Sequence, residues 1–230
     1  MNELLNHLRD ETKQPIDLEP YFAVSVSNVV CNLLMSVRFT RDDPKFLRFN
    51  QMIEEGMQLF GKIYSVEHFP ITQYLPAFQS AKSQIADNRK EMFEFYKEVI
   101  EDHRRTFDRN SIRDLVDFYL LEIELAKENG TEKELFDGRD QEEQIMQIIG
   151  DLFSAGMETI KTTLLWLMLF MVRHPNARKQ VQEELDSVIG RQRMPEHKDL
   201  SYLPNTESTI LEVMRISSIV PLATTHSPMM

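Results

Sequence analysis

The chain has 230 residues, 42% of them hydrophobic, and its 37 acidic residues against 26 Lys and Arg give a formal charge of −11. Such an acidic balance repels phosphate backbones and excludes nucleic acid as a partner. The single cysteine, Cys31, excludes an internal disulfide and a multi-cysteine metal site, which is typical of an intracellular or cytosol-facing chain. With only 7 glycines, few tight turns are expected, and the composition favours an all-α fold.

Hydrophobic periodicity predicts a succession of helices over residues 1–130. The first three are expected at residues 20–38, 44–64 and 81–105. The stretch "HFPITQYLP" carries two prolines and is expected to connect the second of these to the third. Asn110 and Ser111 are expected to cap a further helix, which Gly130 closes.

A longer helix is predicted over residues 139–173, about 50 Å at 1.5 Å per residue. Its apolar run from Thr162 to Val172 is bounded by Lys161 and Arg173, so it is too short to cross a bilayer and suits a buried core helix. No signal peptide or apolar span is recognised at the N-terminus "MNELLNHLRDETKQ".

Two more helices are expected within residues 174–217. Pro175 opens the first of them and Gly190 closes it, and the second carries "NTESTILEVMRISS". Pro221 then predicts an extended segment over residues 218–230.

Gly156 lies in the middle of the long helix, where a glycine costs about 1 kcal/mol relative to alanine. A bare backbone position lets a bulky group approach closely, and Glu158 and Thr159 beside it could hold water or a polar ligand. The alternative is a bent helix, in which Thr159 bonds to the carbonyl four residues earlier and Glu158 is solvated.

Further motifs follow in a fixed order. The string Ala-Gly-Met-Glu-Thr at 155–159 precedes "HPNARKQVQEELDSVIGRQRMP", then Glu-Val-Met-Arg at 212–215, then Pro221 and His226. This series resembles the microsomal members of the cytochrome P-450 family, the haem-thiolate monooxygenases. The resemblance is strongest from about residue 140 to 227 and weaker before it.

The resemblance implies a cytochrome P-450-like helical core, with residues 1–230 as one partial domain. Its parts would be helices at 1–130, a central helix at 139–173, following helices at 174–217 and the start of a pocket strand at 218–230.

The resemblance also implies roles for individual residues. Glu158 and Thr159 would be catalytic, organising the water that delivers protons when the O–O bond of dioxygen is split. Ala155, Gly156 and His226 would bind the cofactor, although His226 is also compatible with an exposed histidine near a chain end. The substrate pocket would include Asp151, Phe153, Ser154, Ile219, Val220 and Leu222.

Glu212 and Arg215 would be structural in this family and brace the side of the core behind the haem. Taken alone, an (i, i+3) pair of this kind indicates no more than a surface ion pair on a helix.

One departure from the family concerns the axial ligand. The family holds its iron through a cysteine thiolate in a glycine-rich loop well after the E-x-x-R helix. The sequence ends at Met230 before such a loop, and Cys31 in "VSNVVCNLLM" is interpreted as a small buried hydrophobe. The chain is therefore expected to be a central fragment, truncated at both ends and inactive alone.

For the full-length family, the resemblance implies haem b, electrons from NADPH through a reductase partner, and the cytosolic face of the endoplasmic reticulum, reached through an N-terminal anchor. The segments "DLFSAGMETIKTTL" and "SSIVPLATTH" look most like arthropod ecdysteroid hydroxylases, which implies a lipophilic, steroid-like substrate. The alternative is a non-catalytic helical scaffold or ligand-binding protein derived from the same fold. A membrane-surface helix protein is disfavoured by the acidic charge.

Overall fold

A computed structural model describes residues 2–10 and 15–221, without the side chains of residues 2, 10 and 60–68. These residues form helices joined by short connections, and no strand occurs among them. The all-α prediction is therefore confirmed. The chain divides into two compact units, Met1–Glu158 and Thr159–Met230, and the prediction of a single domain stays a prediction.

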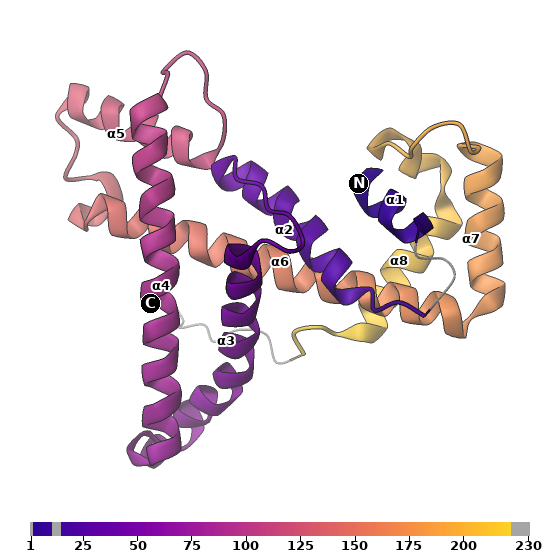
Figure 1. The fold of residues 1–230 in the computed structure, drawn as a ribbon, viewed down its shortest axis with the longest axis horizontal. Helices are drawn as coiled ribbons and strands as arrows, with labels where there is room; N and C mark the ends of the chain where they lie inside the picture. The colour runs from indigo at the N-terminus through magenta and orange to yellow at the C-terminus, as the bar shows by residue number, and fades with distance from the viewer. Residues whose placement is uncertain (1, 11–14, 222–230) are drawn as a thin grey trace, which may run out of the picture. The chain divides into compact units, whose positions relative to one another are not determined.

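The first unit holds most of the helices (Figure 1). They are α1 (Asn2–Asp10), α2 (Glu19–Met35), α3 (Pro44–His68), η1 (Pro70–Tyr74), α4 (Pro76–Thr106), α5 (Leu115–Asn129), η2 (Leu135–Gly138) and the first half of α6 (Gln141–Arg173). All the helices expected in this region are present. α4 begins earlier than predicted, at Pro76, because a proline fits the first turn of a helix, where its missing N–H is not needed.

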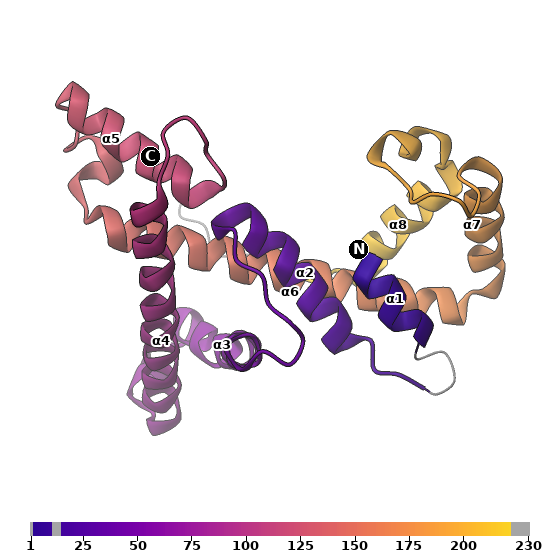
Figure 2. The same cartoon turned by 45° about the horizontal axis from the view of Figure 1, so that its top comes forward.

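Helices α3 and α4 lie side by side, joined through η1 (Figures 1 and 2). Arg48 of α3 donates two parallel hydrogen bonds to the carboxylate of Glu91 on α4, at 2.9 and 2.7 Å. The amide of Asn88 on α4 donates to Glu55 of α3 at 2.9 Å. These paired contacts fix the register of the two helices.

The buried face of α6 follows from its sequence spacing. Ile145, Ile149, Phe153 and Met157 recur at every fourth position, and each is at most 2% exposed. Residues four apart lie on one side of a helix, so the four side chains form a single stripe. Phe153 meets the ring of Phe49 on α3 edge to face, with centroids 6.0 Å apart, which joins α6 to the aromatic core.

The start of α5 corrects the capping prediction. Asp114 is the N-cap, and its carboxylate accepts a hydrogen bond from the backbone N–H of Asp117 at 3.0 Å. Asn110 and Ser111 lie in the preceding turn instead. Gly130 closes α5 as expected, with φ +70°, a conformation that glycine adopts without strain.

The second unit contains the rest of α6, α7 (Pro175–Val188), η3 (His197–Tyr202) and α8 (Pro204–Ser217). Gly190 follows α7 with φ +74°, which confirms its helix-closing role. The carboxylate of Glu184 on α7 accepts four hydrogen bonds at the start of α8, from the backbone N–H and the side chains of Asn205 and Thr206, at 2.7 to 2.9 Å. Glu184 therefore caps a helix to which it does not belong.

The segment after α8 differs from the expected pocket strand. Ser218 turns the chain through a left-handed conformation with φ +39°, and residues 219–221 form a bend and a turn. The strand prediction is wrong for residues 218–221, since an extended segment becomes a strand only beside a partner strand and the described residues offer none. Residues 222–230 lie outside the described residues.

By length and hydropathy, α6 is also the one helix of the described ranges that could cross a membrane. The core helix of a soluble protein meets the same criterion. Within the first unit, α6 uses its buried stripe to pack on protein, including Phe49 of α3.

Candidate active site on the central helix

One face of α6 is exposed and mostly apolar around the predicted catalytic residues. Ala155 and Thr159, one turn apart, are both exposed, and Leu152 and Ile160 beside them are 45% and 47% exposed. Spacings of three and four place Leu152, Ala155 and Thr159 on the same side of the helix. A small side chain and a hydroxyl within an apolar surface fit the approach of a large, flat, apolar group.

Gly156 lies on a different side of α6, against α2. A Cβ atom at this position would lie 3.3 Å from Cγ2 of Val30 and 3.5 Å from its Cγ1. The group that approaches the bare backbone of Gly156 is therefore a valine side chain. The cofactor contact predicted for Gly156 stays a prediction. Its neighbour Ala155 lies on the exposed face of α6.

Glu158 and Thr159 differ in their exposure. Glu158 is half-buried, with one carboxylate oxygen fully covered, whereas Thr159 is exposed. The hydroxyl of Thr163 donates to the backbone carbonyl of Thr159 at 2.7 Å. The alternative for Thr159, a bond to the carbonyl four residues earlier, stays a prediction. The two predicted catalytic side chains thus combine a carboxyl group reaching into the protein with a hydroxyl at the surface.

A cavity of about 290 Å³ lies within the first unit, between α3, α4 and α6. Its walls are mainly apolar, and three of the contributing side chains are methionines, Met52, Met57 and Met92. Methionine is flexible and polarisable, so walls of this kind adapt to lipophilic ligands of different shapes. The volume is at the lower end of the range for small-molecule sites.

The predicted pocket residues separate into three groups. Asp151 and Ser154 line this cavity, and the carboxylate of Asp151 accepts a hydrogen bond from Gln147 at 2.7 Å. Phe153 belongs to the core instead of the cavity wall, because it lies on the buried stripe of α6. Ile219 and Val220 lie in the bend of the second unit. Leu222 and His226 lie outside the described residues.

Tyr96 of α4 is a cavity residue that sequence reasoning missed. Its side chain is 1% exposed, and its hydroxyl has no hydrogen-bond partner among the described residues. Gly150 of α6 lies beside it, since a Cβ there would be in ordinary van der Waals contact, 3.4 Å from the tyrosine ring and 3.9 Å from its hydroxyl oxygen. The sequence contains one signal for this residue, a tyrosine within the apolar face of a predicted helix. Gly150 is remote from it in sequence, so their proximity could not be predicted.

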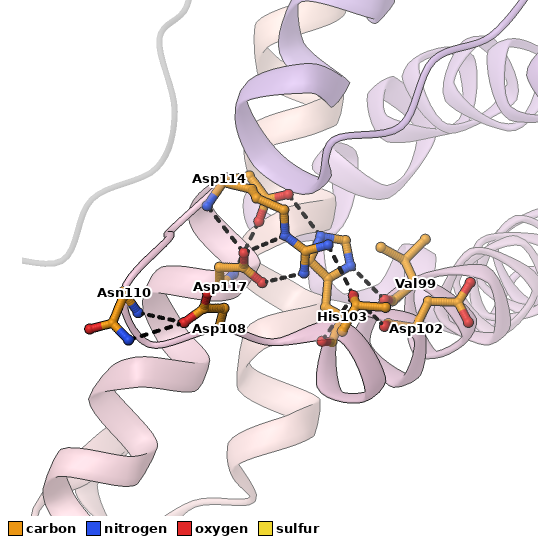
Figure 3. Close-up of polar contacts among 9 residues, drawn as sticks. Val99, Asp102, His103, Asp108, Asn110, Asp114 and Asp117 are labelled. Carbon is orange, nitrogen blue, oxygen red and sulfur yellow. Dashed lines mark hydrogen bonds and ion pairs between the residues drawn. The ribbon is translucent and has the colours of Figure 1, made fainter.

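A second polar cluster lies where α4 ends and α5 begins (Figure 3). His103 is buried between two acceptors: its Nδ1 is 2.8 Å from the carbonyl oxygen of Val99, and its Nε2 is 2.8 Å from the carboxylate of Asp114. A carbonyl and a carboxylate can only accept, so both contacts are hydrogen bonds when both ring nitrogens carry hydrogen, as they do in the imidazolium form. Burial lowers the pKa of His103, but the hydrogen bonds to Asp114 and Val99 outweigh it and raise that pKa.

The same cluster contains three His and Asp residues whose ligand atoms lie close enough together to share a metal ion. His103, Asp114 and Asp117 each bring one ligand atom within 4.8 Å of the others. Arg113 already binds the buried carboxylate of Asp117 with two hydrogen bonds of 2.6 and 2.8 Å, which lowers the pKa of Asp117. A cation would have to displace this guanidinium and the proton of His103. The arrangement is that of a structural ion-pair network.

Cys31 is fully buried in the core of the first unit. Burial raises the pKa of its thiol to about 12, so the thiol stays protonated and unavailable as a metal-binding thiolate. Its interpretation as a small buried hydrophobe is confirmed.

Glu212 and Arg215 form the expected (i, i+3) pair on α8. Two parallel hydrogen bonds of 2.7 Å join the guanidinium to the carboxylate, and both side chains are more than half exposed. The hydrogen bonds from Arg215 lower the pKa of Glu212. The pair is formed, while its bracing role stays a prediction.

The helical fold and the acid–threonine stretch of its long central helix define a class of protein. The chain belongs to the cytochrome P450 family, a family of haem-thiolate monooxygenases, whose family model matches residues 1–229. It is 61% identical to Cytochrome P450 18a1 of Drosophila melanogaster over 228 residues, which are 99% of this chain and 42% of that relative. Cytochrome P450 2U1 of Homo sapiens is 36% identical over 211 residues, and Cytochrome P450 1A1 of Rattus norvegicus is 35% identical over 208 residues. These alignments cover 90% of this chain and 38% of each relative, so the chain spans about two fifths of the curated relatives that it matches.

Proposed function

We propose that this chain provides the oxygen-activating helix and part of the substrate pocket of a haem-dependent monooxygenase that acts on a lipophilic molecule. The observation that carries the proposal is the exposed face of α6, where Ala155 and Thr159 lie one turn apart beside the half-buried Glu158. The methionine-lined cavity, which includes Asp151 and Ser154, supports a lipophilic substrate.

The described residues fit a haem in one respect: they offer a surface for its ring, but no thiolate ligand for its iron. The small side chain of Ala155 allows a flat ring to approach α6, and the apolar Leu152 beside it would cover the edge of that ring. No thiolate ligand comes from Cys31, which is buried and protonated. We therefore propose that α6 would contact the haem through Ala155, and that His226 would bind a haem propionate.

When bound, the haem supplies the activation of dioxygen: one oxygen atom enters a C–H bond of the substrate, and the other leaves as water after uptake of two electrons and two protons. The residues of α6 manage these protons. Thr159 can accept a hydrogen bond from water and donate one towards the oxygen. Glu158 is the neighbouring residue and is half-buried, so its carboxyl group would be the proton relay to this hydroxyl.

The electrons would come from NADPH through a reductase at the cytosolic face of the endoplasmic reticulum, as in microsomal family members. For the substrate, we propose a steroid of the ecdysteroid type, on the resemblance of "DLFSAGMETIKTTL" and "SSIVPLATTH" to ecdysteroid hydroxylases.

The test uses the full-length protein, reconstituted with haem and reductase. A thiolate-type Soret band of the reduced, carbon monoxide-bound protein and hydroxylated product from an ecdysteroid are the expected results. A protein that binds steroid but shows no such band would contradict the proposal and favour a non-catalytic ligand-binding function.

A further inference from the structure

The cavity between α3, α4 and α6 contains one polar group whose hydrogen-bonding capacity is unused. Of the side chains that line it, Tyr96 alone has a buried polar atom without a hydrogen-bond partner among the described residues. Its polar neighbours are engaged: Asn88 donates to Glu55, and the carboxylate of Asp151 accepts from Gln147. A buried hydroxyl left unpaired is costly, so such a group usually has a partner in the functional state.

The position of the Tyr96 ring is fixed by its surroundings. Three aromatic neighbours, Phe49, Phe93 and Phe95, have ring centroids 6.1, 6.5 and 5.9 Å from it. Gly150 lies close to the hydroxyl on the α6 wall, where a larger side chain would occupy part of the cavity. The hydroxyl is thus held in place before any ligand binds, which lowers the entropic cost of recognition.

The chemistry of the walls selects the kind of ligand. Methionine, isoleucine and phenylalanine side chains supply an apolar lining, which fits a lipophilic body. The lining carries one carboxylate, Asp151, and one guanidinium, Arg89, so it has no net charge to attract an ion. A neutral oxygen, as in an alcohol or ketone, is the complement of a phenolic O–H.

We propose that Tyr96 is a specificity-determining residue, which anchors a lipophilic ligand by a hydrogen bond to a neutral hydroxyl or carbonyl oxygen within this cavity. The proposal deepens the proposed function, since it names the polar anchor and the chemical class of its substrate.

The experiment compares two probes of the same shape, 5α-androstan-3β-ol and its hydrocarbon 5α-androstane. Binding to the full-length protein is measured by calorimetry without NADPH, so that turnover plays no part. The wild type is expected to bind the alcohol about tenfold more tightly than the hydrocarbon. In Tyr96→Phe this preference falls to about one, while the affinity for the hydrocarbon is unchanged.

Tyr119→Phe is the matched control, because Tyr119 on α5 contacts Phe118 and Phe136 and does not line the cavity. Thermal unfolding of Tyr96→Phe is expected to match the wild type, since the substitution removes an unpaired hydroxyl and keeps the ring. The proposal is overturned if the wild type shows no preference for the alcohol, if Tyr96→Phe keeps it, or if a structure with the alcohol bound shows only water on this hydroxyl.

The outcomes separate the two proposals. A preference that depends on Tyr96 in a protein without oxygenase activity would support the anchor and reject the monooxygenase. Hydroxylated product from a protein that does not prefer the alcohol would support the monooxygenase and reject the anchor.

Discussion

Val30 of α2 lies directly against Gly156 of α6, with its Cγ2 atom 3.3 Å from the place that a Cβ of residue 156 would occupy. The glycine in the family-like stretch of the central helix therefore has a packing role. It lets two helices of the first unit approach more closely than an alanine would allow.

The Val30 contact predicts that Gly156→Ala changes stability little. Alanine gains about 1 kcal/mol of helix propensity, but its methyl group forces the valine to move, and the two effects roughly cancel. In a Val30→Ala background the valine side chain is absent, so Gly156→Ala should raise the free energy of unfolding by about 1 kcal/mol. Urea unfolding of the four variants of this cycle measures the coupling.

Gly56→Ala is the control, because nothing lies within 4 Å of a Cβ at that position of α3. It should stabilise by about 1 kcal/mol in either background. If Gly156→Ala stabilises the wild type as much as Gly56→Ala does, the packing role is refuted.

His103 predicts a dependence of stability on pH. Its folded pKa is raised above the ordinary 6.5, so its contribution is complete below that value and is lost as the pH rises through the raised pKa. Burial raises the pKa of Asp114, but the hydrogen bond from His103 outweighs it and lowers that pKa below the ordinary 3.8, so its contribution is lost only as the pH falls through the lowered value. The pair therefore stabilises most between about pH 4 and about pH 6.5.

The measurement is the free energy of unfolding from about pH 5 to about pH 9, for the wild type and His103→Gln. The difference in free energy of unfolding between the wild type and His103→Gln should decrease steadily as the pH rises. His197→Gln, at an exposed histidine of η3 outside this cluster, is the matched control for the substitution itself. An advantage of constant size would mean that His103 does not titrate in this range.

Thr159→Ala tests proton delivery on α6. Without the hydroxyl, the oxygen loses its proton donor, so the yield of hydroxylated product per NADPH should fall by about tenfold, with hydrogen peroxide released instead. Thr159→Ser keeps a hydroxyl and should restore most of the yield. Thr163→Ala is the control, because it removes a threonine hydroxyl one turn further along α6, outside the acid–threonine stretch. Equal yields for Thr159→Ala and Thr163→Ala would remove Thr159 from the mechanism.

Glu184 predicts a local effect in the second unit. Partial burial raises the pKa of Glu184, but the hydrogen bonds from Asn205 and Thr206 outweigh it and lower that pKa. In Glu184→Ala the amide hydrogens of Asn205 and Thr206 should exchange with solvent about tenfold faster, because the start of α8 loses its cap. Glu183→Ala removes only an exposed pair with Lys179 and should leave both rates unchanged. Unchanged rates in Glu184→Ala would show that water replaces the cap without loss.

The helices were predictable because their signals are local. The spacing of Ile145, Ile149, Phe153 and Met157 identifies the buried face of α6 from sequence alone. Gly130 ends α5 where expected, because a left-handed residue after a helix requires only its nearest neighbours. The start of α5 was misplaced, since Asp114 is held as a cap partly by His103 on the preceding helix.

The candidate site was predictable only in part. The face of Ala155 and Thr159 follows from helical geometry once the motif is recognised. The pairs Gly156–Val30 and Gly150–Tyr96 join helices far apart in sequence, and periodicity contains no information about which helices meet. For the same reason Asp151 and Ser154 could be assigned to a pocket, but its opposite wall could not.

The three methionines of the cavity have a chemical cost in an oxygenase. Thioethers are readily oxidised, and each sulfoxide replaces a flexible apolar side chain with a polar one. Met57, at 50% exposure, is open to oxidants from solution as well as from the pocket. Under the proposed function, hydrogen peroxide released without product would oxidise these methionines, so the lifetime of the enzyme would depend on how closely electron uptake is coupled to product formation.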